Sequence, residues 1–444
     1  MTDFVTDLTN DIIDSMPDVS KDWAELNALI TLSTFLSKAQ IVERDKALRL
    51  NLIGVMVAPP GMKKSLPIFS FTYPIVIEAG KKIGRDFLLP SRSSVEGFIE
   101  YASMKSEDKK YINNEGIIIR DEFSGLFKQL RKADWQADGM EFISEMYDHN
   151  FQKRMTKTDG LVFFEDLYGS MITATTYHFI TSMDPLFFIQ GTGNRIIYCH
   201  MGANEYNPVK DTIEYFRKGW EGEREDCINK YVEKIEKVYG KINKNQNDPW
   251  WYIYVSEGEL WLDYKFKCEE EWKKKSVDDP FGWSYHPIKR YAELALKLAG
   301  IYEISYQIDR IPKMDSNGFY NFGITKKSIK RGIDFIERCR KYFDEIVKIK
   351  NMNFEREKPK SQEDKAKAML PWLANAPKGI LPTNDWLDRQ DVTTYQNEKY
   401  GLKRFCVARG WVKTLTFKEL DAKTLKMFPG ANGNMEFCQY VKGL

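Results

Sequence analysis

Residues 50–65 read LNLIGVMVAPPGMKKS, and this segment changes character abruptly after Val57. Its first half is an apolar, partly β-branched run, and its second half opens with Ala58-Pro-Pro-Gly61. Such a run is typical of a buried parallel strand that ends in a loop. The following residues, from Ser65 to Lys82, are apolar and numerous enough for a helix. The segment therefore predicts a strand, a loop and a helix in succession.

Further apolar runs repeat this pattern along the chain. Gly116-Ile-Ile-Ile-Arg120 ends in Asp121-Glu122, and Gly169–Thr176 is followed by Gly191–Cys199. Strands that alternate with helices are typical of an α/β fold, in which helices flank a parallel sheet. We therefore expect such a core over residues 49–205.

The remaining segments differ from this core in composition. Lys/Glu-rich stretches predict a helical insertion and lid, with helices at Ile288–Ile308 and Thr325–Ile349 and a short strand at Trp250–Val255. The run NMNFEREKPKSQEDK is polar and charged, which is typical of a linker. Outside the core we expect an N-terminal helical segment at residues 1–48 and the helical insertion and lid at 206–350. The linker is expected at 351–365 and a C-terminal domain at 366–444.

Charge and cysteine content exclude several classes of protein. The chain of 444 residues has 66 basic and 64 acidic side chains, so any contact with nucleic acid must come from local patches. Its six cysteines form no C-x-x-C pair, which gives no support to a zinc ribbon. The start is acidic where a signal peptide is basic, and no apolar stretch reaches the ~18 residues that span a bilayer. We expect a cytoplasmic protein with no membrane partner.

The loop after the first strand carries a nucleotide-binding motif. Ala58-Pro-Pro-Gly-Met-Lys-Lys-Ser65 fits G-x-x-x-x-G-K-[ST], except that Ala58 and Lys63 replace the glycines. A loop between a strand and a helix directs backbone N–H groups at phosphates. Lys64 would contact the β- and γ-phosphates of ATP, and the Ser65 hydroxyl would bind Mg²⁺. The predicted ATP-binding residues of the loop are Pro60, Gly61, Met62, Lys63, Lys64 and Ser65. The alternative is a proline-rich turn with surface lysines.

The acidic pair after the second strand fits the same chemistry. Asp121 would hold the magnesium ion through its water, and Glu122 would orient and activate the attacking water. The alternative is an acidic N-cap for the next helix. Both motifs occur in this order, each after a buried strand, which favours an ATPase.

With these motifs the chain resembles the minichromosome maintenance helicases of the AAA+ class, and more closely their compact virus- and plasmid-borne relatives, which lack the large N-terminal domain. In that family the loop reads like G-D-P-G-x-A-K-S. The family's I-D-E-F-D-K-M box is similar to Arg120-Asp-Glu-Phe-Ser-Gly-Leu126. The resemblance implies an α/β fold with a P-loop NTPase core of AAA+ type, a helical lid and a C-terminal winged-helix domain.

The resemblance also implies roles for residues outside the two motifs. Thr176 lies where the family has its polar sensor, with Thr175 as the adjacent candidate. Asn194-Arg195-Ile196 resembles the arginine finger, which would stabilise charge on a neighbouring subunit's γ-phosphate. Arg290, in a helix similar to the one that bears the second sensor, would contact nucleotide. The alternative for both arginines is a solvated surface position.

Two segments are candidates for DNA binding. The stretch from Met140 to Leu161 is similar to the family's DNA-contacting β-hairpin, and Lys153, Arg154 and Lys157 would contact phosphates in a central channel. Without the resemblance these residues form a solvated hairpin tip. Leu370–Leu420 resembles the winged-helix domain, with a packing or interaction domain as the alternative.

Together these features predict an ATP-dependent DNA helicase or translocase that acts in replication of a small genetic element. Its cofactors would be ATP and Mg²⁺, and its DNA single-stranded or forked. An arginine finger requires a neighbour, which predicts a closed ring of identical subunits, a hexamer. The alternatives are an ATP-switched DNA-binding initiator or regulator that does not unwind DNA, and a DNA-packaging or transposition ATPase.

Overall fold

The computed structural model divides the chain into two compact units, Met1–Lys350 and Asn351–Leu444. Helix α13 (Lys326–Arg356) continues into the expected linker, so the linker's first residues are helical. The structure describes residues 3–43, 46–91, 93, 95–104, 113–123, 135–148, 154–156, 160–162, 167–181, 183, 186–189, 191–201, 220–242, 251–279, 284–310, 322–356, 370, 373–374, 376, 378, 380–388, 396–409, 411–429, 432 and 435–441.

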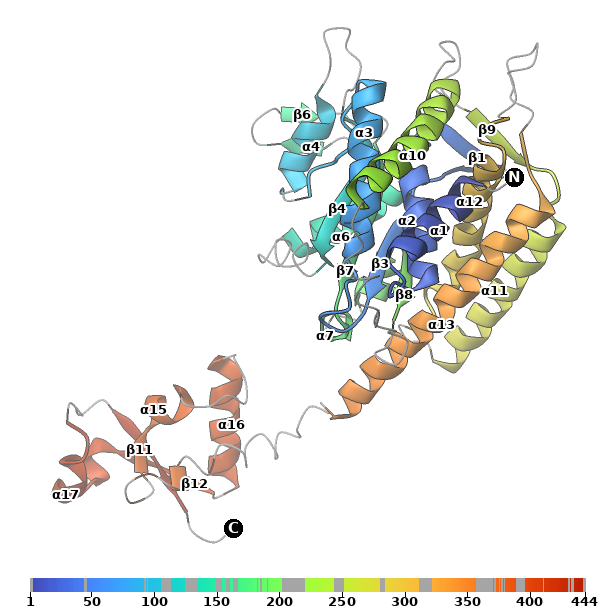
Figure 1. The fold of residues 1–444 in the computed structure, drawn as a ribbon. Helices are drawn as coiled ribbons and strands as arrows, with labels where there is room; N and C mark the ends of the chain where they lie inside the picture. The colour runs from blue at the N-terminus through green and yellow to red at the C-terminus, as the bar shows by residue number, and fades with distance from the viewer. Residues whose placement is uncertain are drawn as a thin grey trace. The chain divides into compact units, whose positions relative to one another are not determined.

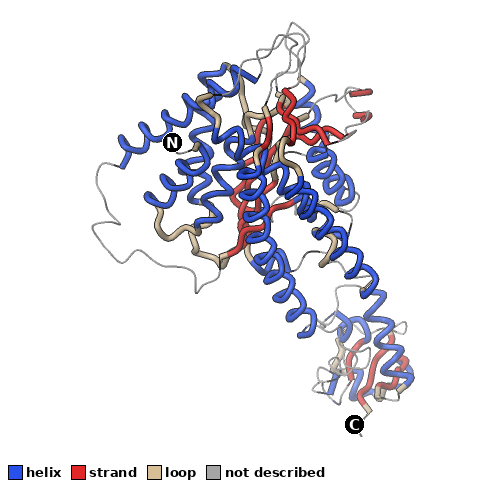
Figure 2. The backbone as a smooth tube through the Cα atoms, turned by 90° about the vertical axis from the view of Figure 1, so that its right-hand side faces the viewer, coloured by secondary structure: helices blue, strands red, loops and turns tan. Residues whose placement is uncertain are grey.

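A parallel sheet forms the centre of the first unit. Its strands are β3 (Ile53–Val57), β4 (Glu115–Glu122), β7 (Tyr168–Thr175) and β8 (Ile196–His200), in the order β4-β7-β3-β8. Every residue of β3, β7 and β8 is buried, because helices cover both faces of the sheet. Figure 2 shows these strands between helices on either side. The expected α/β core with a parallel sheet flanked by helices is confirmed.

The N-terminal helices α1 (Phe4–Ser15) and α2 (Lys21–Ser33) pack on this core instead of forming a separate segment. Every residue of α2 after Lys21 is buried. A Cβ atom at Gly54 would lie 2.5 Å from the Ile30 side chain, so the absence of a side chain there lets α2 lie close to β3. One continuous hydrophobic core joins the expected segments 1–48, 49–205 and 206–350.

The prediction of helix up to residue 48 is wrong after α2. Residues 39–49 form β1 (Ala39–Glu43) and β2 (Lys46–Arg49), which pair antiparallel. They belong to a second sheet of order β10-β9-β1-β2, with β9 (Trp251–Val255) and β10 (Gly323–Ile324). The reason is tertiary: β1 pairs in parallel with β9, which is remote in sequence, and local helix propensity yields to that pairing.

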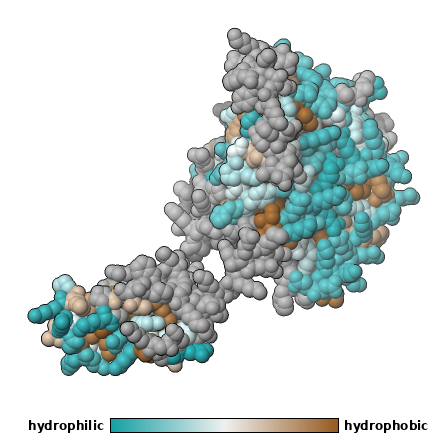
Figure 3. All heavy atoms as spheres, turned by 60° about the horizontal axis from the view of Figure 1, so that its bottom comes forward, coloured by the Kyte–Doolittle hydropathy of each residue, from teal (hydrophilic) through white to brown (hydrophobic). Residues whose placement is uncertain are grey.

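The two helices expected at Ile288–Ile308 and Thr325–Ile349 are present as α12 (Ile288–Tyr306) and α13. The region before them contains α10 (Trp220–Ile242), within the expected Lys/Glu-rich stretch, and α11 (Glu259–Asp278). Figure 1 shows α10 beside α3 (Tyr73–Ile83). It also shows α11 beside α13, to which the ion pair between Glu271 and Arg340 joins it. No helix in the described ranges is both long enough and apolar enough to cross a membrane. Hydrophilic residues predominate among the coloured atoms of the face in Figure 3.

The second unit has its own sheet and core. Strands β11 (Ile380–Pro382), β12 (Val412–Thr416) and β13 (Glu436–Tyr440) pair antiparallel in the order β11-β13-β12. The helices α15 (Thr383–Asp388) and α16 (Gln396–Ala408) precede the strand β12. Its buried side chains include Trp386, Leu402, Cys406 and Phe437.

Candidate nucleotide site

The loop 58–65 lies at the carboxyl end of β3, and β3 lies between β7 and β8 in the sheet. Its first residue is tied to the neighbouring strand, because the Ala58 N–H donates to the Thr175 carbonyl over 3.2 Å. The next helix begins at Leu66, and the Phe69 N–H donates to the Ser65 carbonyl. Lys64 and Ser65 therefore stand at a helix N-terminus, where free N–H groups and the helix dipole favour an anion.

The backbone of the loop is left-handed at two residues. Gly61 has φ 84° and Lys63 has φ 44°. Lys63 occupies a glycine position of the motif, and its conformation costs a residue with a side chain about 1–2 kcal/mol. The Lys63 ammonium pairs with Asp18 Oδ2 at 2.7 Å, and the Asp18 side chain is only 3% exposed. The side chain of Lys63 thus points at Asp18. The predicted contact of Lys63 with phosphate would therefore be made by its backbone N–H group.

Helix α2 holds the loop from the other side. Trp23 is completely buried, and its indole N–H donates to the Lys64 carbonyl over 2.8 Å. Neither Asp18 nor Trp23 was identified from the sequence, because nothing local marks either residue as a neighbour of the loop. The N-terminal segment is therefore part of the site.

The acidic pair stands at an irregular strand end. Arg120 pairs with Thr173 and Glu122 pairs with Ala174, so Asp121 is the extra residue of a β-bulge. Bulges redirect side chains and are common beside active sites. Asp121 and Glu122 are both exposed.

A cavity of about 570 Å³ adjoins the acidic pair. Asp121 and Glu122 line one side of it, and Phe69 and Tyr73 come from the helix that follows the loop. The lining includes the acidic pair but no residue of the loop 58–65, so the cavity reaches the helical segment after the loop and not the loop itself.

The sheet order brings the two motifs to one edge. β7 lies between β3 and β4, so two strand spacings separate their ends, about 10 Å. Thr176 directly follows β7, and its carbonyl accepts the N–H groups of Phe179 and Ile180. The structure thus places the loop with Lys64 and Ser65, the predicted sensor Thr176, and the acidic pair along the same carboxyl edge. In open α/β sheets, ligands bind at this edge.

The oxygen atoms at this edge suit magnesium. Mg²⁺ is commonly held by one or two protein oxygens together with phosphate oxygens. The Ser65 hydroxyl, at the end of the loop 58–65, and the Asp121 carboxylate, at the end of β4, lie at the same edge, and both fit that role. Within the described ranges no cluster of three or more His, Cys, Asp or Glu side chains could hold a metal alone.

Arg195 lies at the opposite edge of the sheet. It ends the turn Gly193–Arg195 before β8, whose first residue pairs with Ile53 at the start of β3. Its side chain is 10% exposed and forms an ion pair with Asp148. Its Nη1 also donates to the Gly191 carbonyl over 2.6 Å. Arg195 is therefore remote from the loop of its own chain.

Arg290 joins Arg195 at the same carboxylate. Its Nη2 lies 3.5 Å from Asp148 Oδ2, and its Nη1 lies 2.6 Å from Glu293 Oε2. Burial raises the pKa of Asp148, but the hydrogen bond from Arg195 and the charge of Arg290 outweigh it and keep the pKa below its ordinary value. The two arginines that the resemblance singled out separately thus form one cluster. Asp148 and Glu293 were not identified from the sequence.

A buried lysine lies beside this cluster. Lys297 is 1% exposed, and its Nζ lies 3.1 Å from Asn51 Oδ1 and 3.4 Å from the centre of the Tyr147 ring. Burial lowers the pKa of Lys297 to about 7. The Lys297 ammonium group therefore releases its proton near neutral pH.

We expect Lys297→Met to flatten the pH dependence of stability. The unfolded chain keeps the Lys297 proton up to about pH 10.4, whereas the folded chain releases it near pH 7. Between these values the unfolded state binds more protons, so the wild-type chain gains stability as pH rises, by at most about 1.4 kcal/mol per pH unit. Urea unfolding of both proteins between about pH 7.5 and 9.5 measures the difference. Lys289→Met, at an exposed position of α12, is the control, and an equal slope for wild type and Lys297→Met would contradict the prediction.

The predicted hairpin is present between α6 (Trp135–Asp148) and β7. Strands β5 (Arg154–Thr156) and β6 (Gly160–Val162) pair antiparallel, with Met155 opposite Leu161. Arg154 begins β5, whereas Lys153 and Lys157 lie outside the described residues.

No model of a known protein family matches this chain, and no curated protein matches its sequence.

Proposed function

We propose that this chain is an ATP-driven DNA translocase or helicase that works as a ring of identical subunits. The observation that carries the proposal is the common carboxyl edge, where the loop 58–65, Thr176 and Asp121-Glu122 follow three adjacent strands. A phosphate-binding loop and an acidic strand end at one edge are the parts that hydrolysis of a nucleoside triphosphate requires.

Each group at the edge has a distinct task in this proposal. Lys64 and the loop N–H groups bind the phosphates, and Trp23 keeps the loop in place through the Lys64 carbonyl. Ser65 and Asp121 hold Mg²⁺, which when bound neutralises charge on the phosphate oxygens. Glu122 orients the attacking water and accepts its proton, and Thr176, between the motifs, positions that water.

The position of the arginine cluster supports a ring. Arg195 and Arg290 lie at the amino edge, and the nucleotide of the same chain would lie at the carboxyl edge. Arginine can stabilise the transferring phosphate only within contact distance. The subunit that supplies these arginines is then a neighbour, and a head-to-tail contact that closes produces a ring, here a hexamer.

Two parts of the chain are proposed to contact DNA. The β5–β6 hairpin would contact phosphates in the ring channel through Lys153, Arg154 and Lys157. The second unit would be a winged-helix domain whose second helix contacts DNA, and the succession of α15, α16 and β12 supports this proposal. In α16, Lys403 pairs with Glu436 of the sheet, whereas Arg404 is exposed and available for DNA. Replication of a small genetic element is the process in which such a motor would act.

The test is steady-state ATPase activity with and without single-stranded DNA, alongside the mass in solution with nucleotide. We expect a ring whose turnover DNA stimulates. A monomer that hydrolyses no ATP under any of these conditions would refute the proposal.

A specific observation favours a second function, an ATP-switched DNA-binding initiator or regulator. Lys63 stands in a left-handed backbone position that the motif gives to glycine, and Ala58 replaces the other glycine. A loop under such strain is compatible with slow hydrolysis. Strand displacement on forked DNA separates the two functions, because only a motor unwinds the fork.

Trp23→Phe is expected to weaken nucleotide binding, because the loop loses the hydrogen bond to the Lys64 carbonyl. Trp261→Phe is the matched control, since its buried indole donates to the Ala292 carbonyl over the same 2.8 Å. Both changes should reduce the free energy of unfolding by about 1–3 kcal/mol. Only Trp23→Phe should raise the Kd for ATP, measured by titration calorimetry. Equal Kd values for both variants would show that α2 does not support the loop.

A further inference from the structure

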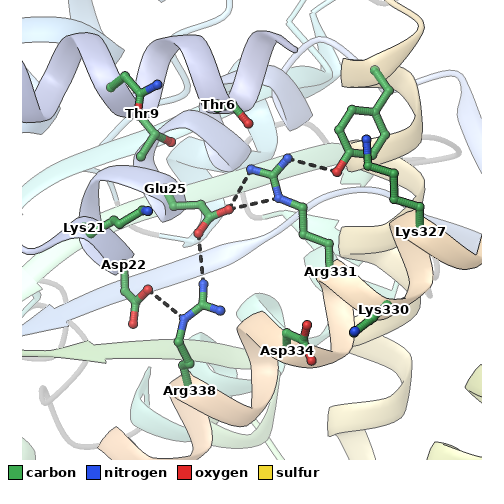
Figure 4. A pocket seen from close by; sticks show the side chains of 12 residues that line it. Thr6, Thr9, Lys21, Asp22, Glu25, Lys327, Lys330, Arg331, Asp334 and Arg338 are labelled. Carbon is green, nitrogen blue, oxygen red and sulfur yellow. Dashed lines mark hydrogen bonds and ion pairs between the residues drawn. The ribbon is translucent and has the colours of Figure 1, made fainter. Parts of the chain in front are cut away.

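A second cavity, of about 660 Å³, lies between the N-terminal helices and α13. Its walls come from α1, α2, α13 and the end of α12, as Figure 4 shows for the first three. The residues that line it include none from the loop 58–65 and neither Asp121 nor Glu122. The cavity is therefore separate from the candidate nucleotide site, and a ligand could bind in it whether or not the chain is an ATPase.

Two carboxylates of α2 hold two arginines at the cavity wall. Glu25 accepts hydrogen bonds from Arg331 at 2.8 Å and from Arg338 at 3.0 Å. Asp22 accepts from Arg338 Nε at 2.8 Å and from the Tyr342 hydroxyl at 2.7 Å. Figure 4 shows both guanidinium groups reaching from α13 towards these carboxylates. Because the carboxylates are engaged, they are poorly available to a cationic ligand.

The charges that remain at the cavity are mostly positive. Apart from the two arginines and their two carboxylate partners, the lining contains three lysines and one carboxylate, Asp334. Lys21 extends from α2, whereas Lys327 and Lys330 extend from α13. Lys327 lies over the Tyr306 ring at 4.1 Å. Within the described part of the chain, the structure gives Lys21 and Lys330 no carboxylate within ion-pair distance. Two lysines on facing walls are thus free to bind a ligand.

We infer that this cavity binds a small, multiply charged phosphate compound, such as the polyphosphate part of a nucleotide. Ammonium groups on facing walls can each contact a different phosphate oxygen. The cavity's volume is that of a small-molecule site. A continuous DNA backbone fits less well, because the lysines gather in one cavity of small-molecule size instead of following an extended groove.

The ligand would connect α13 to the candidate nucleotide site. It would bridge α2 and α13, and α2 carries Trp23, which bonds the loop through the Lys64 carbonyl. Binding in this cavity therefore stabilises the position of α2 against α13, the helix that runs from the first unit into the second.

Titration calorimetry with inorganic tripolyphosphate tests the inference. The chain used carries Lys64→Ala, which removes the lysine of the loop. We expect saturable binding that weakens at least 10-fold when Lys21→Ala and Lys330→Ala are added. The control adds Lys341→Ala and Lys348→Ala instead. These are two exposed lysines of α13 that do not line the cavity, so this variant should bind tripolyphosphate as tightly as the Lys64→Ala chain.

Three results would overturn the inference. The first is that tripolyphosphate does not bind to the Lys64→Ala chain. The second is that it still binds as tightly after the Lys21 and Lys330 changes. The third is that a single-stranded oligonucleotide competes for the site more strongly than tripolyphosphate at equal phosphate concentration. Circular dichroism confirms folding of each variant. In the chain with Lys64 intact, the Lys21 and Lys330 changes should remove one tripolyphosphate site per chain, and an unchanged number of sites would also contradict it.

Discussion

Glu122→Gln is expected to abolish ATP hydrolysis while ATP binding survives. Glutamine keeps the shape of the side chain at the end of β4, but it cannot accept a proton from the attacking water. Removal of a general base lowers turnover by about 10²–10⁴-fold. Phosphate release measures the loss, and titration with a fluorescent ATP analogue measures binding, which should change by less than about 3-fold because the loop 58–65 is intact.

Glu100→Gln is the matched control, because Glu100 is an exposed glutamate of α4 (Val95–Ser103) that does not line the 570 Å³ cavity. It should keep full turnover. Retained ATP hydrolysis in Glu122→Gln would refute the assignment of Glu122 as the general base. Loss of ATP binding in the same variant would show that the acidic pair maintains the structure of the carboxyl edge.

Arg195→Ala is expected to reduce ATP turnover by about 10³-fold or more without loss of ATP binding. An arginine supplied by a neighbour stabilises charge on the γ-phosphate in the transition state and contributes about 10³–10⁵ in rate. Arg195 also pairs with Asp148 in its own chain, so the variant leaves a part-buried carboxylate without this partner. A purely structural role would therefore also lower activity, and turnover alone does not separate the two.

Mixing two inactive variants separates them. In an equimolar ring of Arg195→Ala and Lys64→Ala subunits, about one quarter of the interfaces pair an intact loop with an intact Arg195. Activity should return on mixing if Arg195 acts across the interface. If Arg195 only stabilises its own subunit through Asp148, the mixture stays as inactive as its components.

The strands of the core could be predicted because of their burial. A parallel strand covered on both faces reads as an uninterrupted apolar run, and β3, β4, β7 and β8 all coincide with such runs. The two motifs could be located for the same reason, since each directly follows one of these strands. Segment 39–49 could not, because its strand partner β9 lies about two hundred residues further along the chain.

Local pattern thus determined which residues form the strand ends, and so which loop and which acidic pair stand there. The sheet order β4-β7-β3-β8 alone brought those ends to one edge and sent Arg195 to the other. Side-chain partners were likewise a product of folding: Lys63 turns to Asp18, Trp23 bonds the Lys64 carbonyl, and Arg195 and Arg290 meet at Asp148. The physical reason is range, since burial and periodicity act over a few neighbouring residues, whereas ion pairs and strand order depend on segments that only the folded chain brings together.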